Sequence, residues 1–268
     1  MNDPRELMNE YGLRPNKALG QNFLVDEEAI GLIVRLAGEP GLPVLEIGPG
    51  LGALTVPLAG TGLPLAAVEL DSELCRVLKE RLGERVSIIN ADFLKVAPGE
   101  IAALEGFSGE LTAVGNLPYY ITSPICMRLL TCGLPIRRMV LMMQKEAAER
   151  FLACPRDKNY VPLTVLARLL YGIRPVLGLT PASYYPQPDV SSSVLLFERN
   201  GFEPPEGLPG LLKCAFAMRR KTLLNNLLAL GRGKEETVRL IKEAGLSISA
   251  RAEELEPEDF VRLARVFG

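Results

Sequence analysis

Glycine or polar residues follow several apolar, β-branched-rich runs of the sequence, where strands are expected to end. The run Val44–Ile47 leads into the glycine-rich segment Gly48–Gly52, and Glu69 lies near the end of the next run, Leu65–Leu70. Glycines allow a sharp backbone turn close to a ligand, and an acid about 20 residues further on can accept hydrogen bonds from ribose hydroxyls. Together these features predict a nucleoside site at the carboxyl ends of parallel strands.

Two further runs end in side chains that suit the same ligand. Val86–Ala91 is followed by Asp92, which can reach an adenine amino group, and Leu111–Gly115 is followed by Asn116. The glycine-rich segment lacks the Lys-Ser/Thr pair of a phosphate-binding loop, which favours a nucleoside without a pyrophosphate, such as S-adenosylmethionine. Taken singly, the acids are equally compatible with helix N-caps, and the glycines with an ordinary tight turn.

The tetrapeptide Asn116-Leu117-Pro118-Tyr119 suits methyl transfer to a planar amine. The N6 nitrogen of adenine is a poor nucleophile because its lone pair is delocalised into the ring. The Asn116 amide oxygen and a backbone carbonyl, of Leu117 or Pro118, can accept its two hydrogens and hold it in line with a sulfonium methyl. Tyr119 can stack on the base. An isolated tetrapeptide of this kind is more often a capped turn, but its place after the fourth strand favours catalysis.

The composition excludes several kinds of enzyme. The 268 residues contain no histidine, which excludes Ser-His-Asp and Cys-His hydrolases and every His-ligated zinc site. The five cysteines form no C-x-x-C pair, so we expect no metal site and a reducing, cytoplasmic environment. Met1–Glu10 is too polar for a signal peptide, and no apolar run approaches the roughly 18 residues of a membrane span.

The order of the elements predicts an α/β fold with a Rossmann-like, mostly parallel sheet and helices on both of its faces. Helical periodicity is found in Glu27–Ala37 and Ser72–Leu82, which alternate with the strand-like runs. The last two runs, Val176–Thr180 and Ser193–Phe197, have no helix-length segment between them. We therefore expect them to form an antiparallel hairpin at one edge of the sheet.

A small all-helical domain is predicted at residues 207–268, after a Pro/Gly-rich linker that begins at Asn200. Residues 1–200 are then the cofactor-binding catalytic domain, with 1–40 as an N-terminal segment that gates cofactor and substrate.

Within the helical domain, Pro257 is expected to begin a last helix, and one helical face is expected to carry Leu212, Phe216, Leu223 and Leu227. Residues 207–242 hold eight basic and two acidic residues, although the net charge of the whole chain is −2. A solvated helix face and a nucleic-acid contact both explain such a basic segment.

The motifs taken together resemble the bacterial small-subunit rRNA adenine N6,N6-dimethyltransferases, a class I S-adenosylmethionine-dependent family. The resemblance is nearly full length, and its first and fifth motifs are the most specific. The matching segments are Leu19-Gly-Gln-Asn-Phe-Leu24, Glu46–Gly52, Glu69–Asp71, Asp92, Gly115–Tyr120, Gln144–Glu146, Pro186-x-Pro188 and Arg219–Thr222. It implies that two adjacent adenosines in a stem-loop near the 3′ end of small-subunit rRNA are each methylated twice, on the assembling subunit.

The resemblance also implies roles for single residues. Gly48, Glu69 and Asp92 match contacts to the methionine, ribose and adenine parts of the cofactor, and the full set of cofactor contacts adds Asn22, Leu24 and Asn116. Asn116 lies at both the cofactor and the target amine. Tyr119 and Tyr184 match aromatics that stack on the base, although Tyr184 is equally compatible with an ordinary turn residue.

Further roles concern the RNA. Arg219, Arg220 and Lys221, which open the helical domain, match residues that meet RNA phosphates. Gln144–Glu146 and Arg150 are expected at a strand-to-helix junction below the target pocket, where a structural ion-pair helix is the other interpretation. The sequence departs from the family where Pro188 is followed by Asp189 rather than by lysine, which argues against a phosphate contact at that position.

Other functions remain open from the sequence alone. Macrolide-resistance methyltransferases share the motif order but act on a large-subunit rRNA adenine, and Leu117 and the near-neutral charge favour the small-subunit enzyme. DNA adenine methyltransferases more often have an acid in place of Asn116. A ribosome-assembly factor with secondary catalysis and a nicotinamide dehydrogenase are the alternatives of other classes. We expect a monomer, because no coiled coil or exposed apolar stripe is evident.

Overall fold

The computed structural model describes residues 3–16 and 19–268. Met1, Asn2, Lys17 and Ala18 therefore lie outside the described residues, and with them parts of the expected N-terminal segment. Packing divides the chain into two units, the first made of Met1–Ala148 and Arg174–Glu198, the second of Glu149–Ile173 and Arg199–Gly268. The two units are interleaved along the chain, whereas the sequence suggested the linear boundary 1–200 and 207–268, which stays a prediction about domains.

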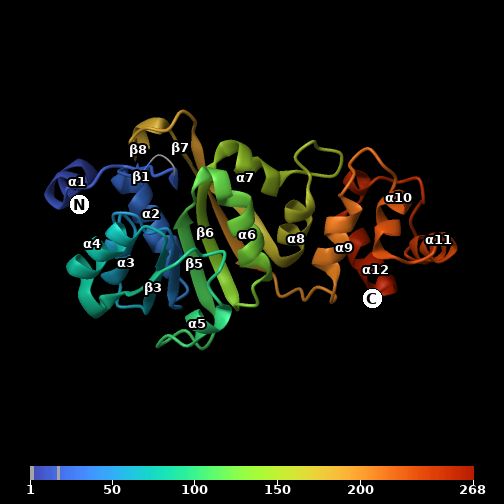
Figure 1. Ribbon diagram of the computed structural model, residues 1–268, viewed down its shortest axis with the longest axis horizontal. Helices are drawn as coiled ribbons and strands as arrows, with labels where there is room; N and C mark the ends of the chain where they lie inside the picture. The colour runs from blue at the N-terminus through green and yellow to red at the C-terminus, as the bar shows by residue number, and fades with distance from the viewer. Residues whose placement is uncertain (1–2, 17–18) are drawn as a thin grey trace. The chain divides into compact units, whose positions relative to one another are not determined.

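Within the described residues, seven strands form the main sheet, in the order β4-β3-β2-β5-β6-β9-β7. The strands are β2 (Val44–Ile47), β3 (Leu65–Glu69), β4 (Ser87–Asn90), β5 (Leu111–Asn116), β6 (Ile136–Gln144), β7 (Tyr171–Leu179) and β9 (Ser192–Arg199). The pairs among β2 to β6 are parallel, and β9 is antiparallel to β6 (Figure 1). The expected α/β fold, a mostly parallel sheet with an antiparallel edge, is confirmed.

Helices α1 (Pro4–Tyr11), α2 (Glu27–Gly38), α3 (Thr55–Ala59), α4 (Ser72–Leu82), α5 (Pro98–Ala102) and α6 (Thr122–Thr131) belong to the first unit, and α7 (Lys145–Leu152) follows β6. Two carboxylates define where helices begin. Asp26 accepts a hydrogen bond from the backbone N–H of Ala29 at 3.1 Å at the start of α2, and Asp71 accepts from Glu73 N at 3.0 Å at the start of α4. No helix in the described part of the chain is long and apolar enough to cross a membrane.

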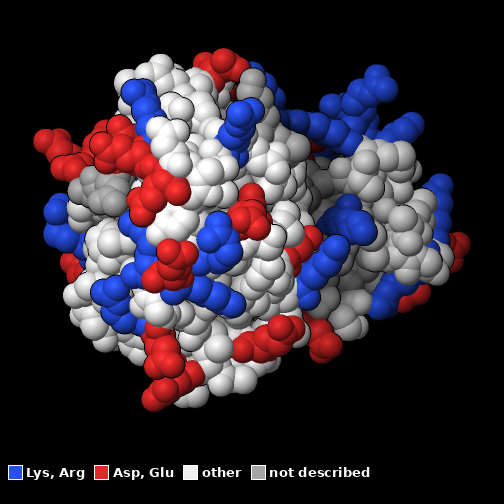
Figure 2. All heavy atoms as spheres, turned by 60° about the vertical axis from the view of Figure 1, so that its left-hand side comes forward, with Lys and Arg blue, Asp and Glu red and all other residues white. Residues whose placement is uncertain are grey.

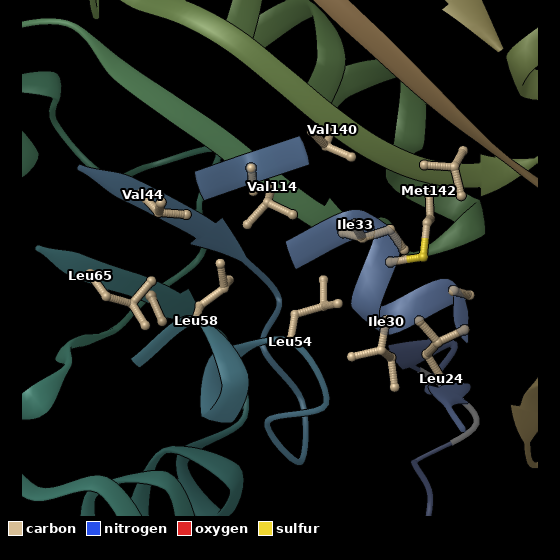
Figure 3. Packing of buried hydrophobic residues seen from close by; sticks show 14 of the residues in the cluster. Leu24, Ile30, Ile33, Val44, Leu54, Leu58, Leu65, Val114, Val140 and Met142 are labelled. Atoms are coloured by element: carbon tan, nitrogen blue, oxygen red, sulfur yellow. The ribbon is translucent and has the colours of Figure 1, made fainter. Parts of the chain in front are cut away.

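The core of the first unit forms where α2 lies on the sheet. Ile30 and Ile33 of α2 pack with Val114 and Val140 of the central strands and with Met142 at the end of β6 (Figure 3). Ile33 and Val140 are completely buried. Because burial of an aliphatic side chain of this size contributes about 1.5–3 kcal/mol, this cluster holds α2 against the strands whose ends carry the site.

The second unit contains helices α8 (Pro162–Leu170), α9 (Leu208–Ala215), α10 (Leu223–Leu227), α11 (Lys234–Glu243) and α12 (Pro257–Phe267) (Figure 1). Pro257 begins the last helix, as expected. The continuous helical face expected from Leu212 to Leu227 is wrong, because α9 ends at Ala215 and α10 begins only at Leu223.

A buried asparagine explains this interruption. The Asn226 amide donates to the backbone carbonyls of Ala215 at 2.7 Å and Met218 at 3.1 Å, and its oxygen accepts from Met218 N at 3.1 Å. The side chain is 1% exposed, so it satisfies the backbone groups that a continuous helix would have paired internally. The turn that it holds, residues 216–222, carries the three basic residues singled out from the sequence.

We predict that Asn226→Ala lowers the free energy of unfolding by about 1–3 kcal/mol, because it leaves buried backbone groups without partners. Urea denaturation monitored by circular dichroism measures the change. The neighbouring Asn225 is exposed, so Asn225→Ala is the matched control and should change stability by less than about 0.5 kcal/mol. Equal effects of the two substitutions would contradict the structural role given to Asn226.

Candidate active site

A pocket lies where the carboxyl ends of β2, β3 and β5 meet the N-terminal loop and β1 (Phe23–Leu24). Every residue predicted to bind the cofactor or to act on the target amine lines it, namely Asn22, Leu24, Gly48, Glu69, Asp92, Asn116, Leu117, Pro118 and Tyr119. All of them belong to the first unit. The sequence prediction that these residues converge at one edge of the sheet therefore agrees with the geometry.

The glycine-rich turn follows β2 and has left-handed backbone at alternate residues. The φ angles are +67° at Gly48, +58° at Gly50 and +89° at Gly52, a conformation that other residues rarely adopt. A Cβ on Gly50 would lie 3.1 Å from two atoms of the Phe23 ring. Glycine is thus required at Gly50 both by its backbone and by the close approach of β1.

Glu69, the last residue of β3, holds this turn in place. Its carboxylate accepts from Gly50 N at 3.1 Å and from Asp71 N at 2.9 Å, so it connects the turn to the start of α4. The side chain is 7% exposed, and burial raises its pKa, while the two backbone N–H groups act in the opposite direction. Each carboxylate oxygen keeps a lone pair for a further donor, as a ribose hydroxyl would require.

Glu46 is a second buried carboxyl in the wall of the pocket, and the sequence pattern indicated no role for it beyond the start of the glycine motif. It is 2% exposed, and its Oε2 atom has no hydrogen-bond partner among the described residues. Burial raises its pKa to about 8, and the nearby Glu69 adds to the increase. Its position inside a buried strand was the signal that could have identified it, because a carboxyl there needs a partner.

Asp92 lies two residues beyond β4, where it lines the pocket. Its Oδ1 atom accepts from Leu94 N at 3.0 Å, and Lys95 lies 3.8 Å from its other oxygen. The backbone contact closes a turn at residues 93–95 and does not cap a helix, because the next helix, α5, begins only at Pro98, and it leaves acceptor capacity on the carboxylate. The helix N-cap interpretation offered by the sequence is therefore wrong at Asp92, and its contact to the cofactor stays a prediction.

Asn116 joins the strand end to the N-terminal loop. Its amide donates to the backbone carbonyl of Asn22 at 2.9 Å, which fixes the side chain at the wall of the pocket. The preceding Gly115 allows β5 and β2 to approach, since a Cβ there would lie 2.7 Å from the Ile47 carbonyl oxygen. Because the anchoring contact uses the amide nitrogen, the Asn116 amide oxygen keeps its capacity to accept a hydrogen bond.

The two candidate backbone carbonyls differ in what they already bind. The Pro118 carbonyl accepts from Ile121 N at 3.2 Å and from the Thr122 hydroxyl at 2.9 Å. Leu117 is buried, and its N–H donates to the Met142 carbonyl at 2.9 Å, which fixes its peptide. Since the Pro118 oxygen already has two donors, the Leu117 carbonyl is the better acceptor for an amine.

Two tyrosines follow in the 3-10 turn η3 (Tyr119–Ile121). The Tyr119 hydroxyl lies 3.1 Å from the Ser192 hydroxyl, and burial raises the pKa of Tyr119. Tyr120 is 56% exposed at the rim, with its ring beside Gly20. The sequence pattern indicated no separate role for Ser192 or Tyr120, because contacts between distant segments carry no local signal.

Tyr184 is not among the residues that line this pocket. It pairs with Leu24 through β8 (Tyr184–Tyr185), is 2% exposed and packs within the apolar core. Burial raises the pKa of its hydroxyl. Because its side chain is buried, Tyr184 serves as a core packing residue here, and its role in stacking on the base stays a prediction.

The remaining predicted residues do not line the pocket. Gln144 ends β6 and Lys145 begins α7, so the expected strand-to-helix junction is present, but neither these residues nor Glu146 and Arg150 line the pocket. Arg219, Arg220 and Lys221 lie in the exposed turn of the second unit. Basic and acidic side chains are mixed over the face shown in Figure 2, as the net charge of −2 suggests.

The fold and the pocket together define a class I methyltransferase. The parallel strands with one antiparallel neighbour, the glycine turn and the acid at the next strand end are the shared features of that class. A family model described as ribosomal RNA adenine dimethylase matches residues 12–267. The chain therefore belongs to the ribosomal RNA adenine dimethylase family, which confirms the resemblance recognised in the sequence and identifies it as an enzyme of rRNA modification.

Curated relatives agree with this assignment. The ribosomal RNA small subunit methyltransferase A of Lactobacillus johnsonii is 38% identical over 277 residues, covering 97% of this chain and 93% of the relative. The protein of the same name from Geobacillus thermodenitrificans is 38% identical over 273 residues, with the same coverage. The chain thus spans nearly the whole length of these relatives.

Solved structures show the same fold. A dimethyladenosine transferase from Plasmodium falciparum superposes with a TM-score of 0.70 at 23% identity, covering 90% of this chain and 95% of the other. The 23S rRNA methyltransferase ErmE superposes with a TM-score of 0.63 at 27% identity, covering 91% and 99%.

We predict that Gly50→Ala weakens binding of the expected cofactor, S-adenosylmethionine, at least tenfold, because the added methyl meets the Phe23 ring and the turn must shift. Gly62 is exposed, with φ +77° and nothing within 4 Å of the position that a Cβ would take, so Gly62→Ala is the matched control for backbone strain. Both variants should lose about 1–2 kcal/mol of stability. Isothermal titration calorimetry separates them, and unchanged binding by Gly50→Ala would contradict the close-approach argument.

We predict that Glu46→Gln stabilises the ligand-free protein increasingly as pH rises. The pKa of Glu46 is raised from 4.5 to about 8 on folding, so the native state holds a proton that the unfolded state releases, and wild-type stability falls between these two values. Glutamine cannot ionise and does not show this loss. Denaturation at pH 5 and at pH 9 measures it, and a stability difference independent of pH would refute the buried-carboxyl account.

Proposed function

We propose that the protein transfers methyl groups from S-adenosylmethionine to N6 of two adjacent adenosines in a 3′-terminal hairpin of small-subunit rRNA, giving N6,N6-dimethyladenosine. The observation that carries the proposal is the position of Asn116, which lies in the pocket wall at the end of β5 and is anchored to the N-terminal loop at Asn22. An amide fixed between the expected cofactor and the expected target suits in-line transfer.

The residues of the pocket fit this cofactor. Glu69 retains acceptor capacity for ribose hydroxyls and Asp92 for the adenine amino group, while Gly48, Asn22 and Leu24 supply backbone and apolar contacts beside the methionine part. The Oε2 atom of Glu46, which has no partner in the described chain, suits a ligand that carries positive charge. When bound, the cofactor supplies an electrophilic methyl group on a sulfonium.

The target amine would be held by two acceptors of this chain. The Asn116 amide oxygen and the Leu117 carbonyl each accept one N6 hydrogen, since the Pro118 carbonyl is already occupied by Ile121 and Thr122. Two acceptors favour a pyramidal nitrogen whose lone pair is available for attack. Without histidine in the chain, positioning and electrostatics are expected to supply most of the rate enhancement.

The base would be held by stacking on Tyr119. The ring lines the pocket, and its hydroxyl is fixed 3.1 Å from the Ser192 hydroxyl, so it loses little freedom when a base binds. We propose that exposed Arg220 and Lys221 meet RNA phosphates on the second unit.

We further propose that the protein works as a monomer on the assembling small subunit in the cytoplasm. The 38% identity to small-subunit enzymes over nearly the whole chain supports this substrate. Methylation of large-subunit rRNA is the second candidate, because the 23S rRNA enzyme ErmE shares the fold across 91% of this chain. An assembly factor in which binding dominates is the candidate of a different class.

We predict that Asn116→Ala lowers kcat by about 100-fold or more, because the amine loses one of its two acceptors. Binding of the unmethylated small subunit should be retained, since the RNA-contacting surface is elsewhere in the chain. Single-turnover methyl transfer and filter binding measure the two properties. Turnover at the wild-type rate would exclude the role proposed for Asn116, whereas loss of subunit binding would point to a folding defect, which circular dichroism identifies.

A further inference from the structure

Two exposed loops of the second unit lie against each other. One is the turn 216–222 between α9 and α10, and the other is the segment 154–160 before α8. Besides Arg219, the exposed cations of the two loops are Arg156, Lys158, Arg220 and Lys221, and we refer to these four residues as the two-loop basic surface.

Arg219 connects the loops. Its guanidinium donates to the backbone carbonyl of Lys158 and, at 2.9 Å, to that of Asp157. Its third nitrogen, Nε, lies 3.8 Å from the carboxylate of Glu253, whose side chain is 17% exposed. A guanidinium offers donors in a planar fork that can reach two neighbouring carbonyls at once, which an ammonium cannot reproduce.

The segment 154–160 is held in one conformation by further contacts. Arg156 has φ +75°, a conformation that residues other than glycine rarely adopt, and its N–H donates to the Glu253 carbonyl at 2.6 Å. The Tyr160 hydroxyl donates to the Leu255 carbonyl at 2.9 Å. Because the segment is fixed at both of these residues, its exposed side chains have a defined place relative to Arg220 and Lys221.

The charges of these loops are unequally satisfied. Within the described chain, none of the four cations of the two-loop basic surface makes an ion pair, whereas the neighbouring acids are engaged. Asp157 accepts from Asn159 N at 2.7 Å, Glu253 lies beside Arg219, and Glu254 accepts from Arg251 N at 2.8 Å. These four cations outnumber the two exposed carboxylates beside them, Asp157 and Glu254, which favours a polyanion as the partner.

We propose that Arg219 is a positioning residue rather than a phosphate contact, and that it joins two loops into one surface on which Arg156, Lys158, Arg220 and Lys221 bind RNA phosphates. The proposal rests on the proposed function for the identity of the RNA. It extends the basic surface to a segment that the sequence placed in a different domain, and it replaces the direct contact that the family resemblance implies for Arg219.

The test compares charge-conserving and charge-removing variants. Affinity for unmethylated small ribosomal subunits is measured by filter binding over a range of salt concentrations, and methyl transfer is measured on the same samples. Arg219→Lys should weaken binding about as much as Arg219→Ala, roughly tenfold, because lysine keeps the charge but loses the fork. Arg220→Lys should bind like the wild type.

Removal of single cations should act differently. Arg156→Ala, Lys158→Ala and Arg220→Ala should each weaken binding and reduce the salt dependence by about one counterion. Arg239→Ala is the matched control, because Arg239 is 69% exposed on α11 of the same unit but pairs with Glu243, and it should leave binding unchanged. Hydrogen exchange of residues 154–160 should accelerate in Arg219→Lys and not in Arg220→Lys.

Three outcomes would overturn the proposal or separate it from the proposed function. Wild-type binding by Arg219→Lys combined with weak binding by Arg219→Ala would make Arg219 a direct cation contact. Unchanged binding by both Arg156→Ala and Lys158→Ala, with methyl transfer intact, would overturn the surface and leave the function standing. Salt-dependent binding that follows the expected pattern without any methyl transfer would support the surface and contradict the function.

Discussion

The pocket depends on one buried carboxylate, that of Glu69. By accepting from the backbone of Gly50 and of Asp71, it holds the glycine turn, the end of β3 and the start of α4 in one arrangement. The connection extends outward, because Asp71 also accepts from the Gln21 amide at 3.0 Å, which brings the N-terminal loop to the same place. The hydrogen bond from Asn116 to Asn22 connects the end of β5 to the same loop. A few polar contacts thus join segments that are far apart in the sequence.

This arrangement has an electrostatic cost that the ligand can offset. Glu46 and Glu69 are both buried, and burial disfavours the charge on each carboxyl. The charge of Glu69 further raises the pKa of Glu46, and the charge of Asp71 raises that of Glu69. A ligand with positive charge and hydroxyl donors would relieve both penalties on binding. The chain therefore holds at the pocket an unfavourable interaction that is complementary to the proposed cofactor, as functional sites often do.

The sequence predicted most of this site because parallel strands end at the same edge of a sheet. The residue after each apolar run, such as Asp92 or Asn116, is necessarily near its counterparts, and the glycine turn has a backbone that only glycine adopts readily. The fold was predicted from the alternation of strands and helices and the family from its motifs, and both are confirmed. The roles of the individual site residues and the boundary between the domains stay predictions.

What sequence patterns missed depends on contacts between distant residues. Asn226 lies in a segment with helical periodicity. Its side chain, however, bonds backbone groups of Ala215 and Met218, so the chain forms the turn 216–222 instead of one continuous helix. Arg219 has the appearance of a free cation, but the carbonyls that it binds lie about 60 residues earlier in the chain. Tyr184 aligns with a stacking aromatic and is buried in the core. No local pattern contains information about such partners.

The most direct test of the account is the product of methyl transfer. Labelled S-adenosylmethionine would be offered with unmethylated small subunits and, separately, with protein-free large-subunit rRNA, and the digested RNA analysed for N6,N6-dimethyladenosine. The account predicts this nucleoside from the small subunit alone. Product from large-subunit RNA alone, or none from either RNA by protein that binds the cofactor, would contradict it.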